Sequence, residues 1–291
     1  MKKKILITGT SGFIGNFFLK NALNKGYEVT DILRLKNKKN KDLRQLKIKF
    51  PKSYNSIFFF KTKDLEKKLK NKKFDYFINF ATLYKNSHSN SLISNFIESN
   101  ISFPSTILDL VFQNTKKFIN FGTMMQHCDG KNYISKNFYA STKSAFEMII
   151  NYFANQNKKL KYYNLKFFES FSENDKRKKL IPTLYRDFKK NKTTKIISKK
   201  LELNIIHIKD IVNATYNVMN NNIKSGDYCL INPKNIKIED LISTINNKSK
   251  KKLKIKFLSS MVLRPQKSYL KVLPNFKFDT EIKNKIEKMF K

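Results

Sequence analysis

Cysteine is scarce in this chain. Only two cysteines, Cys128 and Cys229, occur among the 291 residues, which excludes a disulfide framework and leaves too few ligands for a cysteine-based zinc site. Long apolar stretches are also absent, because no window approaches the ~18 consecutive apolar residues of a membrane span. The apolar run after the N-terminal lysines, Ile5–Ile7, is too short for a signal peptide. We therefore expect a cytoplasmic, reduced protein with no membrane span.

Acidic side chains are few as well. Asp and Glu number 22 against 60 Lys and Arg, which gives a formal net charge of +38. Such a charge allows a nucleic acid as partner, but only five of the cations are arginines and the lysines are spread along the whole chain. Because Lys, Asn, Ile and Phe are all abundant, as in proteins from AT-rich genomes, we interpret the charge as compositional background. We do not expect a nucleic-acid partner.

The apolar residues that are present form a regular pattern over the first 168 residues. Short apolar runs predict strands, and amphipathic segments between them predict helices. This alternation predicts an α/β fold, a Rossmann-type doubly wound parallel sheet. The predicted strands are 4–8, 29–33, 56–60, 76–80, 118–121 and 162–168, and the predicted helices are 13–23, 64–70, 92–111 (kinked or broken near Pro104) and 138–153.

The rest of the chain is less regular. Strands are predicted at 203–208 and 228–231, and helices at 238–245 and 280–289. We expect residues 1–168 to form a dinucleotide-binding domain. Residues 169–291 then form a smaller, mostly substrate-binding C-terminal lobe, from which a segment at about 203–220 returns to the first domain.

Glycine is rare too, yet three of the seven glycines lie in one short segment. Gly9, Gly12 and Gly15 form a GxxGxxG motif between the first predicted strand and the first predicted helix. Glycines there permit a tight turn, let backbone N–H groups approach a pyrophosphate, and let the helix pack closely on the strand. The N-terminus of the helix adds partial positive charge. The segment predicts dinucleotide binding through Gly9, Ser11, Gly12, Phe13, Ile14 and Gly15.

The end of the second strand indicates which dinucleotide is bound. An acidic residue there would bind the ribose hydroxyls of NAD, but this position holds Leu33, and Arg34 follows it. A guanidinium pairs well with the 2′-phosphate of NADP. We therefore favour NADP(H), with NAD(H) as the alternative. Asp31 lies two residues too early, and a solvated Arg34 is the competing interpretation.

These features and several later motifs resemble the extended short-chain dehydrogenase/reductases, the nucleotide-sugar epimerase/dehydratase family. The resemblance covers nearly the whole chain, and its closest branch is the reductases around CDP-abequose and CDP-paratose synthases. It implies further cofactor contacts from Asp64 and Leu65, from Phe80, Ala81 and Thr82, and from Asn100. The segments that carry it are 8–15, 63–65, 80–82, Asn100 with Thr106, 137–147, 174–180, 206–211 and 273–276.

The catalytic pair of this family is YxxxK, and composition alone gives roughly two chance matches in a chain with 13 Tyr and 55 Lys. Three matches occur. Tyr162/Lys166 lies in a predicted strand, and Tyr185/Lys189 lies beyond the cofactor half. Tyr139/Lys143 opens a predicted helix, where a spacing of four puts both side chains on one face. The resemblance makes Tyr139 the proton-transfer residue. A neighbouring ammonium lowers the pKa of a tyrosine, and Lys143 would also hold the nicotinamide ribose.

The third catalytic residue of the family, a Ser or Thr after the fifth strand, is replaced in this chain. The expected position holds Met124, whose thioether cannot donate a hydrogen bond, and Thr123 precedes it. Thr123 is therefore our candidate for the role. Met125-Gln126 replaces the Asp-Glu pair of the 4,6-dehydratases, so dehydration is disfavoured. His127 and Cys128 are either acid/base residues for epimerisation or, more often in such loops, lining residues.

The substrate-binding residues are less clearly indicated by the sequence. Glu169 opens a segment that replaces the family's substrate-contacting residues, and Arg177 and Arg264 are candidates for binding a nucleotide diphosphate or, equally, ion-paired surface arginines. With Met124, Gln126 and His127 they form the predicted substrate contacts. No metal site is predicted, because neither His88 nor His207 has a second ligand at suitable spacing.

Three functions remain open from the sequence. The first is an NADP(H)-dependent oxidoreductase that reduces a 4-keto-6-deoxy nucleotide-diphosphate sugar. The second is a nucleotide-sugar epimerase that retains its cofactor. The third is a non-catalytic cofactor-binding protein, which Met124 motivates. The resemblance also implies a homodimer built on the YxxxK helix, where Phe146, Ile149, Ile150 and Phe153 would serve either the dimer surface or the core.

Overall fold

The computed structural model describes residues 2–59, 61–261, 266–278 and 281–290. The chain divides into two compact units. The first contains residues 1–128, 132–166 and 218–228, and the second contains residues 129–131, 167–217 and 229–291. Of the segment 203–220 that we expect to return to the first domain, only 218–220 are grouped with the first unit, and 221–228 follow them there.

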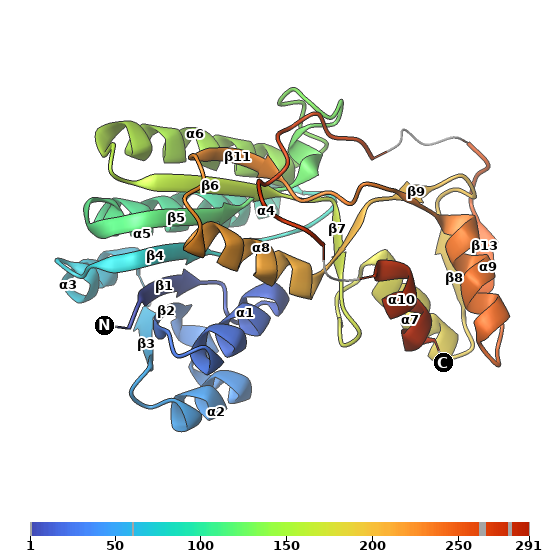
Figure 1. Cartoon of the computed structure of the whole chain (residues 1–291), viewed down its shortest axis with the longest axis horizontal. Coiled ribbons are helices and arrows are strands. Elements are labelled where there is room, and N and C mark those ends of the chain that lie inside the picture. The colour runs from blue at the N-terminus through green and yellow to red at the C-terminus, as the bar shows by residue number, and fades with distance from the viewer. Residues whose placement is uncertain (1, 60, 262–265, 279–280, 291) are drawn as a thin grey trace. The chain divides into compact units, whose positions relative to one another are not determined.

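The first unit is built on a seven-stranded sheet in the order β11-β6-β5-β4-β1-β2-β3 (Figure 1). Adjacent strands from β1 to β6 pair in parallel. This is the usual strand order of a Rossmann sheet, with its switch point between β1 and β4, and it confirms the predicted fold class. The bounds are β1 (Lys4–Thr8), β2 (Glu28–Arg34), β3 (Tyr54–Phe59), β4 (Phe74–Asn79), β5 (Thr115–Phe121), β6 (Lys161–Lys166) and β11 (Gly226–Cys229).

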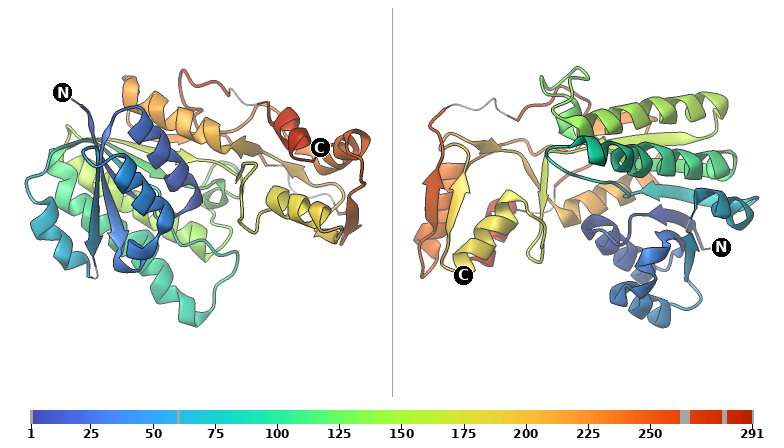
Figure 2. Two further views of the ribbon diagram at one scale, coloured as in Figure 1. Left: turned by 90° about the horizontal axis from the view of Figure 1, so that it is seen from below. Right: turned by 180° about the vertical axis from the view of Figure 1, so that it is seen from behind.

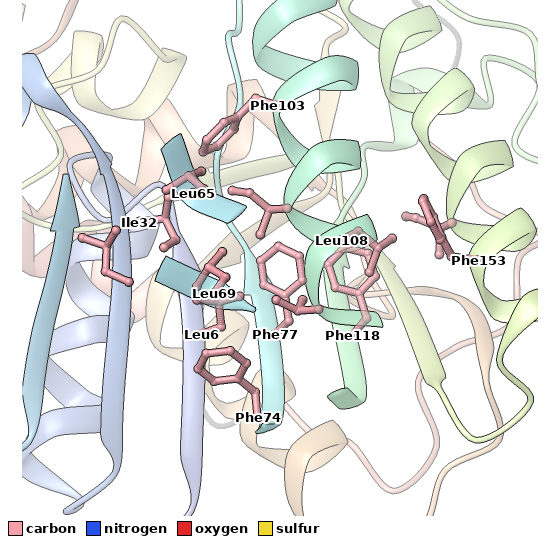
Figure 3. Close-up of a cluster of buried hydrophobic side chains, with 14 of the residues drawn as sticks. Leu6, Ile32, Leu65, Leu69, Phe74, Phe77, Phe103, Leu108, Phe118 and Phe153 are labelled. Atoms are coloured by element: carbon pink, nitrogen blue, oxygen red, sulfur yellow. The ribbon is translucent and has the colours of Figure 1, made fainter. Parts of the chain in front are cut away.

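Helices cover both faces of this sheet, with α5 and α6 opposite α1 and α2 (Figures 1 and 2). Leu6 of β1 and Phe77 of β4 belong to one buried apolar cluster with Leu108 of α5 and Phe153 of α6 (Figure 3). The helices are α1 (Phe13–Asn24), α2 (Lys41–Lys49), α3 (Glu66–Leu69), α4 (Asn90–Ile97), α5 (Phe103–Val111) and α6 (Phe138–Gln156), with short 3-10 turns at Leu35–Lys39, Thr62–Leu65, Phe112–Asn114 and Met124–Gln126.

Helix α6 resolves the two roles left open for its apolar residues. Phe146, Ile150 and Phe153 are buried in the core, and Ile149 packs against it. The large apolar side chains that α6 exposes are instead Met148 and Tyr152.

The helix predicted over 92–111 is continuous but contains a π-helical turn, Glu98–Ser102, between α4 and α5. Pro104 stands in the first turn of α5. Because proline lacks an N–H and its ring crowds the preceding turn, the helix widens before it instead of breaking. Such turns are frequent at functional sites, and this one carries Asn100.

The second unit contains three two-stranded sheets and a separate apolar core that includes Leu184, Leu241, Ile286 and Phe290. The predicted helix at 280–289 begins at Ile282, and Thr280 lies outside the described residues. None of the described helices is both long and apolar enough to cross a membrane. The remaining elements are β7 (Glu169–Phe171), β8 (Thr193–Ile196), β9 (Glu202–Leu203), β10 (Ile205–His207), β12 (Ile236–Lys237), β13 (Lys254–Phe257), α7 (Leu180–Lys189), α8 (Ile208–Asn220), α9 (Ile238–Lys248) and α10 (Ile282–Met289).

Candidate active site

The glycine-rich loop joins β1 to α1 at the switch point of the sheet. Gly9 has φ +80°, and a Cβ atom there would lie 2.4 Å from the backbone nitrogen of Ala81. A Cβ atom on Gly15 would lie 2.4 Å from the carbonyl oxygen of Gly9. Both positions therefore require glycine. The loop runs against the segment after β4, and α1 begins at Phe13 without a side-chain cap at Gly12. The N-terminus of this helix places partial positive charge beside the loop, so the cradle fits a dinucleotide.

The residues at the end of β2 differ sharply in environment. Asp31 is fully buried and accepts hydrogen bonds from the hydroxyls of Thr10, at 2.6 Å, and Tyr54, at 2.7 Å. Burial raises the pKa of Asp31 to about 7, and the two hydrogen bonds oppose this rise. Leu33 is buried as well. Arg34 is half-buried and donates to the Ser99 hydroxyl at 2.8 Å, which fixes the position of its guanidinium.

The other predicted cofactor contacts have distinct surroundings in the first unit. Asp64 is exposed and accepts from the backbone N–H of Lys61, whereas Leu65 is buried in the core. The ring of Phe80 lies between those of Phe18 and Phe121, with centroid distances of 5.4 and 4.4 Å.

Asn100 connects the loop after β4 to α6. Its Oδ1 accepts from the Thr82 hydroxyl at 3.1 Å and from the backbone N–H of Leu83 at 2.7 Å. Its Nδ2 donates to the Thr142 hydroxyl at 3.0 Å. The Thr142 hydroxyl in turn donates to the carbonyl oxygen of Tyr139 at 2.7 Å. The π-helical turn therefore fixes the start of α6 against the loop after β4.

Tyr139 and Lys143 lie in the first two turns of α6. Asn137 caps the helix by accepting from the backbone N–H of Ala140 at 3.0 Å. Both predicted catalytic side chains are buried, Tyr139 at 8% and Lys143 at 2% exposure. Burial lowers the pKa of Lys143 to about 8, and the charge of Glu147, one turn further along, opposes this fall. A proton donor and an ammonium with a pKa near neutrality thus share one helix face.

The segment after β5 forms a tight turn around the predicted third residue. The Thr123 hydroxyl oxygen accepts from the backbone N–H of Met125 at 3.2 Å, and Gln126 Oε1 accepts from the backbone N–H of Thr123 at 2.8 Å. Because the Thr123 oxygen is the acceptor in its bond, its hydroxyl proton can still be donated. Met124 is buried at 1% exposure, so its thioether is withdrawn from solvent.

Lys166, whose YxxxK match with Tyr162 we interpret as a chance product of composition, is completely buried on β6. Its ammonium lies 2.9 Å from Glu147 Oε2 and 3.0 Å from Asp227 Oδ2. It also donates to His127 Nε2 at 3.0 Å, so His127 donates from Nδ1 to the Asn132 carbonyl. A lysine inside an apolar strand is almost never buried unless it is paired, and that was the signal available in the sequence.

A row of buried amides, also missed from the sequence, crosses the sheet beside this cluster. The Thr8 hydroxyl donates to Asn79 Oδ1 at 2.7 Å, Asn79 to Asn120 at 3.0 Å, Asn120 to Asn164 at 3.1 Å, and Asn164 to Asp227 Oδ1 at 2.7 Å. The first four residues are register partners on adjacent strands. Since a carboxylate only accepts hydrogen bonds, Asp227 fixes which group donates and which accepts in every bond of the row.

The predicted substrate contacts in the second unit are engaged in ion pairs. Arg177 donates to both carboxylate oxygens of Asp175 and to the Ser170 hydroxyl. Glu169 lies 3.1 Å from the ammonium of Lys179. Arg264 lies outside the described residues. The roles of Glu169, Arg177 and Arg264 in substrate binding therefore stay predictions.

The sheet order, the glycine cradle and the buried Tyr–Lys pair define a nicotinamide-dependent enzyme of the Rossmann class. A sequence model of the NAD dependent epimerase/dehydratase family matches residues 5–231. The chain belongs to this family, which confirms the resemblance seen in the sequence.

The chain is also similar to several known proteins. CDP-abequose synthase of Yersinia pseudotuberculosis is 27% identical over 227 residues, covering 77% of this chain and 75% of that protein. CDP-abequose synthase of Salmonella muenchen is 22% identical over 262 residues, covering 88% and 84%. The structure of UDP-glucuronic acid 4-epimerase from Bacillus cereus, in complex with UDP-glucuronic acid and NAD, is similar with a TM-score of 0.81 at 19% identity, covering 99% of this chain and 98% of that one.

Proposed function

We propose that this protein is an NADP(H)-dependent reductase of a 4-keto-6-deoxy nucleotide sugar. The observation that carries the proposal is the Tyr139/Lys143 pair, capped and buried at the start of α6, in a chain similar to two CDP-abequose synthases. The absence of an acidic pair after Thr123 favours reduction over dehydration.

The reaction adds a hydride to the keto carbon and a proton to its oxygen. When bound, the reduced nicotinamide supplies the hydride. Tyr139 donates the proton from its hydroxyl to the developing alkoxide, and solvent restores that proton afterwards. The Lys143 ammonium stabilises the phenolate left on Tyr139, because a cation beside a phenolate favours the charged form. Thr123 has a hydroxyl proton available to hold the same substrate oxygen.

The choice of NADP(H) is supported by Arg34. It ends β2 directly after Leu33, which holds the position of the usual acidic residue, and Ser99 and the Phe103 ring, 5.9 Å from the guanidinium carbon, hold it there. A guanidinium with one hydrogen bond made keeps donors for a 2′-phosphate.

The second candidate is an epimerase, the activity named for solved structures that share this fold. An epimerase oxidises and re-reduces the same sugar, so it consumes no cofactor. Incubating the purified protein with NADPH and a CDP-linked 4-keto-6-deoxy sugar separates the two candidates. The reductase oxidises one NADPH for each hydroxyl sugar formed. An epimerase leaves NADPH unchanged and releases tightly held cofactor when it is denatured.

We also propose that the protein is a homodimer. The apolar side chains exposed on α6, Met148 at 68% and Tyr152 at 58%, support a contact through this helix. The molar mass in solution, measured by light scattering, tests the proposal, and Met148→Glu should yield monomers.

A further inference from the structure

A buried charge cluster lies one helical turn beyond the Tyr139/Lys143 pair. Lys166, at 0% side-chain exposure, contacts the carboxylates of Glu147, at 2%, and Asp227, at 30%. One ammonium thus faces two carboxylates, which leaves the cluster with a surplus of negative charge. Burial raises the pKa of Glu147 and the ammonium of Lys166 opposes this rise, so a second cation nearby would further favour the ionised carboxylate.

The neutral members of the cluster do not supply that cation. The Tyr133 hydroxyl lies 2.8 Å from Glu147 Oε2 and 2.9 Å from Asp227 Oδ2, and burial together with the two carboxylates raises the pKa of Tyr133, so it stays a phenol. His127 accepts from Lys166 and is therefore neutral. The row of amides that ends on Asp227 carries no charge either.

Lys143 is a buried cation beside this negatively charged cluster. It is 2% exposed, and among the described residues no carboxylate oxygen lies within 4.0 Å of its ammonium. Glu147 is four residues further along α6 and therefore on the same helix face. Its Oε1 has no hydrogen-bond partner within the described part of the chain. It lies 2.9 Å from the position that a Cβ atom would take on Gly122, where only a glycine leaves it room.

We propose that Glu147 is a positioning residue whose carboxylate, paired with Lys166 on one side, holds Lys143 in its protonated form on the other. The inference rests on the proposed function, which assigns Lys143 its role beside Tyr139. Burial lowers the pKa of Lys143 and the charge of Glu147 raises it, in agreement with this arrangement. The titratable groups of the helix and cluster are Tyr139, Lys143 and Glu147 on α6, His127 and Tyr133 in the loop after β5, Lys166 on β6 and Asp227 on β11.

The pH dependence of cofactor binding tests the proposal without any sugar substrate. We would titrate the protein with NADPH, and in parallel with NADH, between pH 7 and 9.5, following the fluorescence of the bound dihydronicotinamide. This range lies above the pKa of ~6 of the 2′-phosphate. In the wild type, binding should weaken as Lys143 loses its proton. In Glu147→Gln the midpoint of this loss should fall by about one unit or more, the effect of removing a neighbouring opposite charge.

Two variants control the experiment. Glu287→Gln makes the same change at a buried carboxylate that pairs with Lys248 in the second unit, at 2.5 Å, and it should leave the midpoint unchanged. Glu147→Asp keeps the charge and should restore the wild-type midpoint. If Glu147→Gln does not fold, Asp227→Asn removes the surplus charge from the partly exposed member, and its midpoint should fall instead.

The outcomes distinguish a failure of the positioning role from a failure of the proposed function. A folded Glu147→Gln chain that binds cofactor with the wild-type midpoint overturns the positioning role and leaves the proposed function standing. If Glu147→Gln is unfolded, an unchanged midpoint in Asp227→Asn overturns the positioning role in its place. If the wild type binds neither NADPH nor NADH, the proposed function fails and the inference fails with it.

Discussion

The hydroxyl of Thr10 donates a hydrogen bond of 2.6 Å to the carboxyl group of Asp31, and both side chains are completely buried. The bond joins the glycine-rich loop to β2 beneath the surface that would receive the cofactor. Tyr54 on β3 donates to the same carboxyl oxygen. Asp31 is therefore a structural acid under the loop and is not placed to bind a ribose.

The ionisation of Asp31 should make stability depend on pH. Burial raises its pKa from 3.8 to about 7. A carboxyl group with a raised folded-state pKa contributes stability that is fully present below pH ~4 and is lost as the pH rises through about 7. Asp31→Asn removes this loss. Its free energy of unfolding relative to the wild type should rise from pH 4 to pH 8 by a few kcal/mol, since each pKa unit corresponds to ~1.4 kcal/mol.

Chemical denaturation at pH 4, 6 and 8 measures this difference. Asp64→Asn, a change at an exposed carboxylate of the same unit, should show no comparable trend. A difference between Asp31→Asn and wild type that stays constant with pH would show that Asp31 is ionised in the folded protein throughout this range.

Tyr139→Phe should abolish proton donation while leaving the fold intact. The ring stays in its contact with Tyr84, 5.0 Å between centroids, so melting temperature and NADPH affinity should change little. The turnover number should fall by ~10²–10⁴, the usual contribution of a general acid. Retention of full activity by Tyr139→Phe would exclude Tyr139 as the proton donor.

Arg34→Ala should change the preference between the two cofactors. A hydrogen bond to a charged group contributes ~1.5–3 kcal/mol, so the affinity for NADPH should fall by about 10- to 100-fold while that for NADH is nearly unchanged. Arg44→Ala, on α2, is the matched control because the Arg44 guanidinium donates to the backbone carbonyl of Lys38. Equal losses for NADPH and NADH in Arg34→Ala would assign Arg34 a structural role instead.

The turn after β5 yields a contrast between two neighbouring residues. Thr123→Val removes the hydroxyl and should lower the turnover number by ~10²-fold if that hydroxyl donates to the substrate oxygen. Met124→Ser removes a buried side chain and should cost ~2–5 kcal/mol of stability, with little change in turnover of the folded protein. Turnover and melting temperature, measured together, check both. The reverse pattern would give the catalytic role to position 124.

Much of the fold was predictable because its signals are local. Apolar runs and glycine spacing predicted the six N-terminal strands of the sheet. Helices α2, α7 and α8 were not predicted. Lysines obscure the apolar face of α2, and α7 carries a proline, Pro182, in its first turn. The predicted helix from 92 to 111 matches the observed helical segment, which runs from 90 to 111. Its π-helical turn was not predicted, because it depends on tertiary contacts of Asn100 that no local pattern reveals.

The site was predictable only where residue type and local position coincide. Tyr139 and Lys143 combine a motif with a helix start. Lys166 was set aside because its match with Tyr162 is a product of composition, and the structure gives it a different significance through Glu147 and Asp227. Those partners are 19 and 61 residues away in the chain, so only the fold could assemble them.

The central claim is that Tyr139 and Lys143 support reduction of a 4-keto nucleotide sugar. Single-turnover oxidation of NADPH, with a panel of CDP-, dTDP-, UDP- and GDP-linked 4-keto-6-deoxy sugars, tests it most directly. The account predicts stoichiometric oxidation with at least one member of the panel, lost in Tyr139→Phe. A protein that binds NADPH but oxidises it with none of these sugars would contradict it.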